Sequence, residues 1–165
     1  MKQGSVYIYS GDGHGKSPAA LGKAVLTAAQ GKNVVIIQFL KEKGLADSEF
    51  LHRLEPEIKV FRFEKSELNF FELPVEKQTE EVINMKNGIN FAKKVLATGE
   101  CDLLILDEVL GLVDNGIITA DDLKTLLETR DDETDIIMTG ISLNDEICML
   151  ADEVSRIETL KIKCC

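Results

Sequence analysis

Residues 10–17 have the sequence Ser-Gly-Asp-Gly-His-Gly-Lys-Ser, and this stretch decides which fold the chain can adopt. It follows the run 6–9, which has the length and composition of a β-strand. It leads into residues 16–30, where apolar side chains recur every three or four positions, as they do in a helix. A glycine-rich turn between a strand and a helix lets backbone N–H groups surround an anion, and the helix adds its positive N-terminus. The stretch therefore predicts a phosphate-binding loop.

Within this loop, Lys16 offers a mobile positive charge and Ser17 a hydroxyl that can ligate Mg²⁺. The general P-loop pattern, G-x-x-x-x-G-K-[ST], begins with glycine, whereas Ser10 stands at that position here. The alternative is a glycine-rich turn without a ligand. It is disfavoured because a chance Gly-Lys-Ser at such a junction would rarely come with three alternating glycines. The nucleotide-binding residues predicted in the loop are Gly11, Asp12, Gly13, His14, Gly15, Lys16 and Ser17.

A second polar element follows the apolar run 103–106, which has the pattern of a buried strand. Asp107 and Glu108 come directly after it, at the point where parallel sheets bind their ligands. We expect Asp107 to bind Mg²⁺ together with Ser17, because hard cations prefer oxygen ligands. Glu108 would support the metal or orient a substrate. Ordinary strand-end polarity explains such a pair equally well when it stands alone, so the metal site depends on the phosphate loop.

The rest of the sequence alternates short apolar runs with longer segments of helical periodicity. This alternation predicts an α/β fold in one domain, residues 1–165, with a mostly parallel central sheet flanked by helices. Asn87-Gly88 falls inside the longest helical segment, where a glycine would let another chain or a ligand approach closely. Further strands are expected at 34–39, 59–63, 136–138 and 154–157, and helices at 48–54, 75–97, from 119 onward, and at 142–150.

Composition narrows the functions that this chain can have. A net charge of −10 argues against a nucleic-acid partner, because phosphate backbones are bound by a surplus of Lys and Arg. Residues 1–4 lead directly into a strand without a signal-peptide pattern, and no apolar run could span a bilayer, so we expect a cytoplasmic location.

The four cysteines lack the C-x-x-C spacing that is typical of zinc sites. Cys101 and Cys148 are expected in the core, and no chemistry requires Cys164 and Cys165.

Five stretches spread over nearly the whole chain share their pattern with one family. They are the loop with its continuation (10–22), Val-Ile-Ile-Gln-Phe-Leu-Lys (35–41), Leu-Ile-Leu-Asp-Glu (104–108), Ile-Met-Thr-Gly (137–140) and Leu-Ala-Asp-Glu-Val (150–154). In these stretches the sequence resembles the ATP:corrinoid adenosyltransferases, which have a RecA-like P-loop NTPase fold. The glycine-rich loop combined with Gln-Phe-Leu-Lys is the most specific part, because generic P-loop ATPases lack the second element.

The resemblance implies transfer of the 5′-deoxyadenosyl group of ATP to the cobalt of a reduced corrinoid, with release of triphosphate, in cobalamin biosynthesis or salvage. It also implies Mg²⁺ as cofactor, ATP as co-substrate, a homodimer and a reductase partner. The cobalt is itself the nucleophile, so no catalytic base is expected, and Lys16 would position ATP and stabilise the leaving group. Gln38, Lys41 and Glu108 join the loop as nucleotide-binding residues.

Three positions depart from the family pattern, which usually has Lys, Thr and Arg where this chain has His14, Pro18 and Ile141. Each change removes a charge or a donor near the phosphates. A non-catalytic ATP- or corrinoid-binding homologue is therefore the alternative, and an unrelated small P-loop kinase or ATPase is the third hypothesis.

The resemblance also implies that residues 68–73 correspond to an aromatic loop that lies over the corrin in the family. Phe70 and Phe71 would equally suit core or dimer packing.

Overall fold

The computed structural model describes residues 4–41 and 48–163. Within these ranges the strands form one six-stranded sheet in the order β3-β2-β4-β5-β1-β6, and every neighbouring pair is parallel. The predicted α/β fold is confirmed, with a sheet that is parallel throughout. The strands are β1 (Val6–Ser10), β2 (Val34–Gln38), β3 (Ile58–Arg62), β4 (Leu103–Asp107), β5 (Asp135–Gly140) and β6 (Glu153–Arg156).

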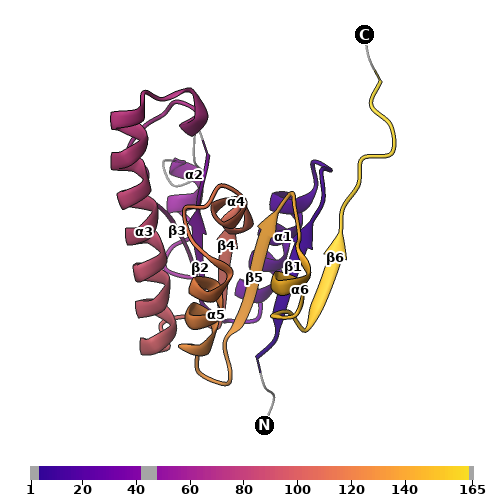
Figure 1. Ribbon diagram of the computed structural model, residues 1–165. Helices are drawn as coiled ribbons and strands as arrows, with labels where there is room; N and C mark the ends of the chain where they lie inside the picture. The colour runs from indigo at the N-terminus through magenta and orange to yellow at the C-terminus, as the bar shows by residue number, and fades with distance from the viewer. Residues whose placement is uncertain (1–3, 42–47, 164–165) are drawn as a thin grey trace.

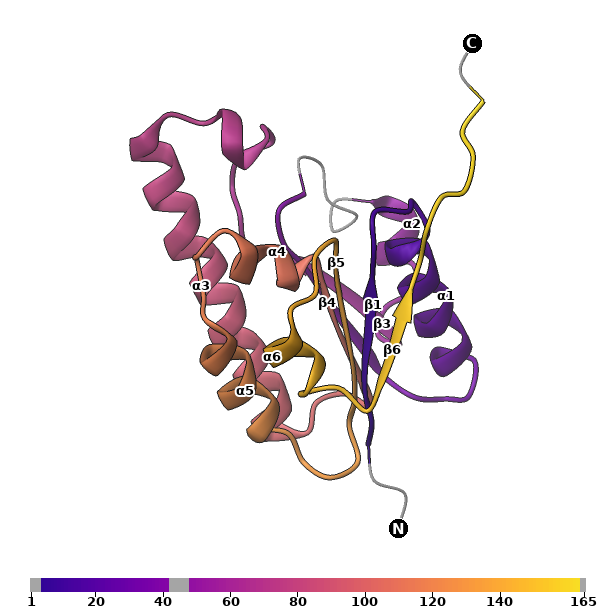
Figure 2. The ribbon, with the colours of Figure 1, turned by 45° about the vertical axis from the view of Figure 1, so that its right-hand side comes forward.

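Helices cover both faces of this sheet, and the strands all end at the same edge (Figure 1). α1 and α2 lie on one side of the sheet, and the remaining helices lie on the other (Figure 2). β5 separates β1, which leads into the phosphate loop, from β4, which ends in Asp107; this order fits the RecA-like arrangement. The helices are α1 (Lys16–Ala28), α2 (Glu49–His52), α3 (Val75–Thr98), α4 (Val109–Asp114), α5 (Ala120–Glu128) and α6 (Asp145–Cys148), with a 3₁₀ turn, η2, at Phe70–Glu72.

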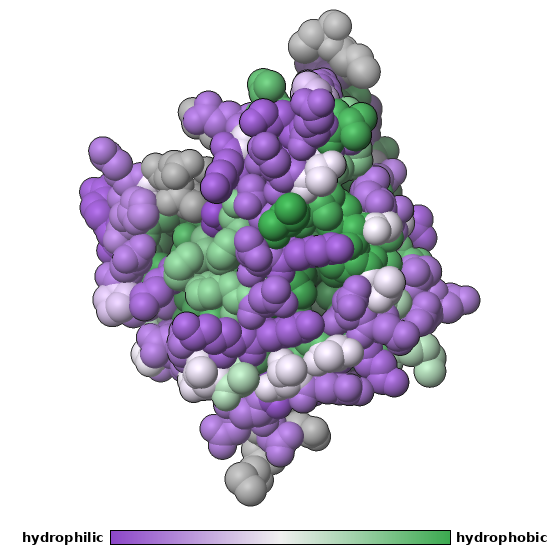
Figure 3. Space-filling model, turned by 60° about the vertical axis from the view of Figure 1, so that its left-hand side comes forward, coloured by the Kyte–Doolittle hydropathy of each residue, from purple (hydrophilic) through white to green (hydrophobic). Residues whose placement is uncertain are grey.

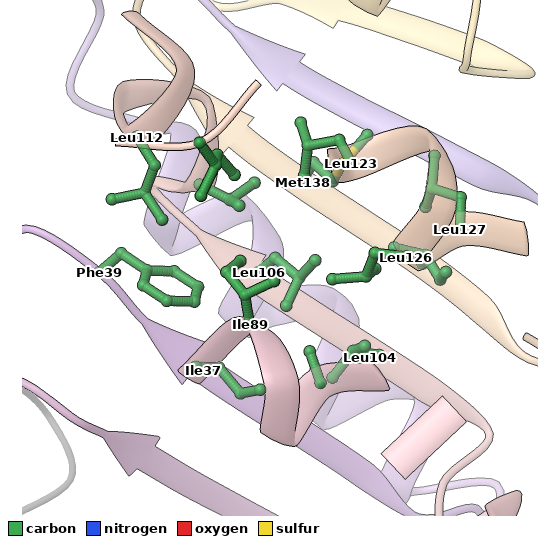
Figure 4. Close-up of a cluster of buried hydrophobic side chains, with 14 of the residues drawn as sticks. Ile37, Phe39, Ile89, Leu104, Leu106, Leu112, Leu123, Leu126, Leu127 and Met138 are labelled. Carbon is green, nitrogen blue, oxygen red and sulfur yellow. The ribbon is translucent and has the colours of Figure 1, made fainter. Parts of the chain in front are cut away.

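Two hydrophobic cores form because successive strand residues point to opposite faces of the sheet. Ile36 and Ile105 pack under α1, whereas Ile37 and Leu106 belong to the larger core on the α3 and α5 side. β2 and β4 are buried at every position, which explains their continuous apolar runs. The larger core also includes Phe39, Ile89, Leu104, Leu112, Leu123, Leu126, Leu127 and Met138 (Figure 4).

Some local predictions were wrong. The helix expected over 142–150 is only the single turn α6, because the Asn144 side chain accepts from the Ile147 N–H at 2.8 Å and fixes the start. Cys101 is buried as predicted, but Cys148 at the end of α6 is exposed, since Ile147 is the residue of that turn that faces the core. The short helix α4 was not predicted. Cys164 and Cys165 lie outside the described residues.

The surface shows where the sheet and helices leave apolar side chains accessible. The face on the α3 side has apolar residues gathered in its middle and polar residues around them (Figure 3). Near α3, Phe61 and Phe91 pack with ring centroids 4.8 Å apart and line an open pocket of about 430 Å³. Among the described residues, no helix combines the length and the apolar character that a membrane span requires.

Gly88 lies inside α3 without breaking it. A Cβ atom at this position would lie 2.9 Å from Phe39 Cε1 and 3.2 Å from Phe63 Cδ2. Phe39 is 1% exposed and belongs to the larger core. The close approach that the sequence suggested is therefore made by the chain's own phenylalanines, and not by a ligand or another chain.

Gly88→Ala should lower the free energy of unfolding by about 1–2 kcal/mol, because overpacking outweighs the gain in helix propensity. Gly22→Ala in α1 is the matched control, since no atom lies within 4 Å of its Cβ position. That variant should gain up to about 1 kcal/mol. Urea denaturation measures both, and equal stabilisation of the two variants would show that Phe39 does not need the glycine.

Candidate functional site

The phosphate loop enters α1 through Gly15, the N-cap residue of the helix. The first helical hydrogen bond runs from the Ala19 N–H to the Gly15 carbonyl at 2.9 Å. Pro18 thus occupies the first turn, where N–H groups have no helical acceptor, and its missing N–H costs the helix nothing. The loop still loses one donor that could have faced a phosphate.

Lys16 folds back over the loop that precedes it. Its Nζ donates to the Gly13 carbonyl at 2.9 Å, and the residue is only 8% exposed. An ammonium has three N–H donors, so a group held in this way can also contact an anion. The lysine and the positive N-terminus of α1 therefore act at the same point.

Asp107, at the end of β4, is 3% exposed and joins several segments. Its Oδ1 accepts from Ser17 Oγ and from Thr139 Oγ1, each at 2.8 Å. Lys41 Nζ lies 3.5 Å from Asp107 Oδ2 and donates to Ser17 Oγ at 3.2 Å. The structure thus brings the predicted metal pair, Ser17 and Asp107, into contact.

These oxygen atoms suit a hard divalent cation. The described residues contain no group of three or more His, Cys, Asp or Glu side chains that could enclose a metal ion. A Mg²⁺ ion at Ser17 and Asp107 would therefore complete its octahedron with water and phosphate oxygens, which is how Mg²⁺ usually binds at nucleotide sites. The donor set fits Mg²⁺ held together with a nucleotide better than Mg²⁺ held by protein alone.

Glu108 has a left-handed backbone conformation, with φ 62° and ψ 19°. Its N–H donates to Thr139 Oγ1 at 2.8 Å, so the Thr139 hydroxyl links the Glu108 backbone to the Asp107 carboxylate. Burial raises the pKa of the Glu108 carboxyl, against the opposing effect of Lys41. Backbone strain of this kind, on the order of 1–3 kcal/mol, is frequent where a side chain must be aimed at a ligand. The sequence did not reveal the role of Thr139, because only the pairing of strands brings it there.

Gln38 ends β2, is 3% exposed and stands opposite Asp107 in the sheet register. Lys41 follows after Leu40, whose φ of 54° turns the chain. Two buried side chains hold this turn: the Leu40 N–H donates to Glu64 Oε1 at 3.1 Å, and Arg62 Nε and Nη2 donate to the Lys41 carbonyl at 3.1 and 2.7 Å. Burial raises the pKa of Glu64 to about 7. Arg62 and Glu64, which hold the backbone at a predicted site residue, were not predicted from the sequence.

The segment that follows β6 runs along the phosphate loop. The Ile157 N–H donates to the Ser10 carbonyl at 2.8 Å, and the Gly13 N–H donates to the Ile157 carbonyl at 3.1 Å. A Cβ atom at Gly11 or Gly13 would lie 2.3 or 2.7 Å from the Ile157 oxygen. These two glycines are therefore required by the close approach of the chain's own C-terminal segment, whatever they also contribute to phosphate binding.

The exposed part of the loop is attached to the same segment. The His14 N–H donates to Thr159 Oγ1 at 3.3 Å, and the side chains of Asp12 and His14 are exposed. The N–H groups of Gly13 and His14 are thus hydrogen-bonded to residues 157–159. The donors available to an anion are concentrated around Lys16 and Ser17.

An open pocket of about 370 Å³ lies beside the loop, and Ile141 and Arg156 both line it. Ile141 is 59% exposed and offers no charge, as the sequence indicated. Arg156 stands beside Ser10 in the register and pairs with Glu158 at 2.7 Å. This guanidinium was not predicted from the sequence, because only the pairing of β6 with β1 brings it to the loop.

In the aromatic segment before α3, the two phenylalanines differ in burial. Phe70 is partly buried against the larger core, whereas Phe71 is 57% exposed. Leu68 and Val75 are 65% and 77% exposed. Figures 1 and 2 place this segment at the same end of the molecule as the phosphate loop. Core packing thus explains Phe70, and the remaining apolar side chains face solvent near the site.

The fold, the loop and the Ser17–Asp107 contact define a P-loop nucleotide-binding protein. Within that class, the family model of ATP:corrinoid adenosyltransferase BtuR/CobO/CobP matches residues 2–164, and the chain belongs to this family. The chain is similar to the corrinoid adenosyltransferase of Escherichia coli (strain K12), with 26% identity over 160 residues, 97% of this chain and 79% of the relative. It is also similar to the corrinoid adenosyltransferase CobA of Salmonella typhimurium (strain LT2), with 27% identity over 161 residues and the same two coverages.

Two truncations test the contact between the loop and the C-terminal segment. Removing residues 157–165 should weaken ATP binding by about tenfold or more, because the loop loses hydrogen bonds worth roughly 0.5–1.5 kcal/mol each. Removing residues 161–165 should change the affinity by less than about twofold, since residues 161–163 are exposed. Calorimetric titration with ATP measures both, and equal affinities of the two truncated chains would contradict the contact's role.

Proposed function

We propose that this chain transfers the 5′-deoxyadenosyl group of ATP to the cobalt of a reduced corrinoid and releases triphosphate. One observation carries the proposal: Ser17 contacts the Asp107 carboxylate directly, in a chain that belongs to the corrinoid adenosyltransferase family. Lys16 is held over the same loop. The three departures from the family pattern leave this contact intact.

The residues of the site would act by binding and charge stabilisation. The C5′–O bond of ATP breaks with its electron pair going to triphosphate, while cobalt(I) supplies the pair that forms the Co–C5′ bond. No proton moves, so no protein base is needed. Lys16 and the N-terminus of α1 would stabilise the charge on the leaving triphosphate. Ser17 and Asp107 would hold Mg²⁺, which neutralises phosphate charge when bound. Gln38 and Lys41 would contact the nucleotide, and Glu108 the nucleotide or its metal.

The corrinoid must reach the same edge of the sheet as ATP. The segment around η2 and the start of α3 lies at that end (Figure 1). It includes the exposed apolar residues Leu68, Phe71 and Val75, which suit the face of a large flat ring. We propose that residues 68–75 contact the corrinoid. The homodimer, the reductase partner and the cytoplasmic location stay predictions.

A non-catalytic ATP- or corrinoid-binding homologue is the second candidate. His14, Pro18 and Ile141 favour it, because none of the three presents a charge or a donor to the loop comparable with the Lys, Thr or Arg of the family pattern. The His14 N–H is already bonded to Thr159. Arg156 favours the enzyme, because its guanidinium lines the pocket that Ile141 shares.

Anaerobic incubation with ATP, Mg²⁺ and chemically reduced cobalamin, followed optically, should show formation of the adenosyl product. Lys16→Ala should lower kcat/KM on the order of 10- to 100-fold, the worth of one charge-assisted hydrogen bond. Lys23→Ala is the matched control, because Lys23 is exposed in the same helix and should leave the rate unchanged.

A wild-type chain that binds both substrates without forming product would reject the enzyme. In that case, the combined variant His14→Lys, Pro18→Thr and Ile141→Arg separates two explanations. Product formed only by this variant would indicate a site weakened at those positions, whereas continued inactivity would favour the binding protein.

A further inference from the structure

We propose that the Lys41 ammonium occupies the cation position at the Ser17–Asp107 pair, so that a divalent ion must displace it in order to bind. The inference rests on the proposed function in that Ser17 and Asp107 are the metal ligands. It adds that the Lys41 ammonium competes with a divalent ion for these ligands, which weakens binding of the ion when no nucleotide is bound.

The position of Lys41 Nζ supports this directly. It lies 3.2 Å from Ser17 Oγ and 3.5 Å from Asp107 Oδ2, the two residues that supply the proposed ligands. The Asp107 side chain is 4% exposed, so its charge needs a partner. Across residues 4–41 and 48–163, Lys41 is the basic side chain within 4.0 Å of that carboxylate, whereas Lys16 donates to the Gly13 carbonyl.

The backbone of Lys41 is held by buried side chains, while its own side chain is partly exposed. Arg62 holds the Lys41 carbonyl with two hydrogen bonds, and Glu64 holds the preceding N–H. The Arg62 and Glu64 side chains are 9% and 6% exposed, so both belong to the interior. The Lys41 side chain is 30% exposed and has a flexible four-carbon stem, so its ammonium can leave without moving the chain.

An ammonium and a divalent ion cannot share this place. Mg²⁺ binds oxygen ligands at about 2.0–2.1 Å, so an ion on Ser17 Oγ and Asp107 would stand within a few ångströms of the present Nζ position. Repulsion between the cations is only partly screened at a buried carboxylate. A nucleotide relieves it, because its phosphates compensate both charges and give the displaced ammonium an acceptor. Lys41 therefore makes metal binding depend on ATP.

Mn²⁺ alone, without nucleotide or corrinoid, is the probe that tests this proposal, with free Mn²⁺ measured by electron paramagnetic resonance. Lys41→Met keeps the apolar stem and removes the charge, and it should bind Mn²⁺ about tenfold more tightly than the wild type, or more. Lys59→Met removes the same charge from an exposed position on β3 and should stay within about twofold of the wild type. Lys41→Gln gives a second neutral variant if Lys41→Met does not fold.

Asp107→Asn in the Lys41→Met background should abolish the gain. Equal Mn²⁺ affinity of wild type and Lys41→Met would overturn the proposal, and so would an equal gain by Lys59→Met, which would indicate an effect of net charge alone. Mn²⁺ binding that survives Asp107→Asn would place the ion elsewhere and overturn it too. The readout needs no adenosyl transfer, so failure of the proposed reaction and failure of this proposal are distinguishable.

Discussion

Asp107 carries a charge at a place that is 3% exposed, and a buried carboxylate without partners costs several kcal/mol, about the whole margin of stability of a small domain. Its partners come from three separate segments: Ser17 at the start of α1, Thr139 in β5, and Lys41 after β2. These segments meet only because β4 lies between β2 and β5 in the sheet. The strand order therefore constrains the position of the phosphate loop and the position of the proposed metal site together.

The same constraint explains which part of the site could be predicted from the sequence. Continuous apolar runs predicted β2 and β4, and the polar residues that end β4 predicted Asp107 and Glu108 at the edge of the sheet. Gln38 was implied by the family resemblance. The contact between Ser17 and Asp107 followed from two motifs that lie 90 residues apart. Motifs of this kind are local, so they are visible before the fold is known.

The remaining parts of the site depend on which strands become neighbours. Thr139 reaches Asp107 because β5 pairs with β4, and Arg156 reaches the loop because β6 pairs with β1. Arg62 and Glu64 hold the turn before Lys41 through backbone groups, which leave no residue pattern. Periodicity also could not show the single turn α6, where one capping side chain decides which residue faces the core.

The glycine-rich loop has two roles in this fold. Gly11 and Gly13 allow Ile157 to approach, while Lys16 and Ser17 face the place where an anion and a cation would meet. The spacing of the glycines alone is therefore weaker support for phosphate binding than the presence of Lys16 and Ser17. The function depends on what these two side chains and Asp107 do to ATP.

In the proposed reaction, ATP reacts at C5′ while its three phosphates stay joined. Phosphorus NMR of an anaerobic mixture of the protein with ATP, Mg²⁺ and reduced cobalamin tests this reaction, because it distinguishes triphosphate from ADP and orthophosphate. We expect triphosphate in an amount equal to the adenosylated cobalamin. ADP with orthophosphate in place of triphosphate would contradict this reaction and identify an ATPase.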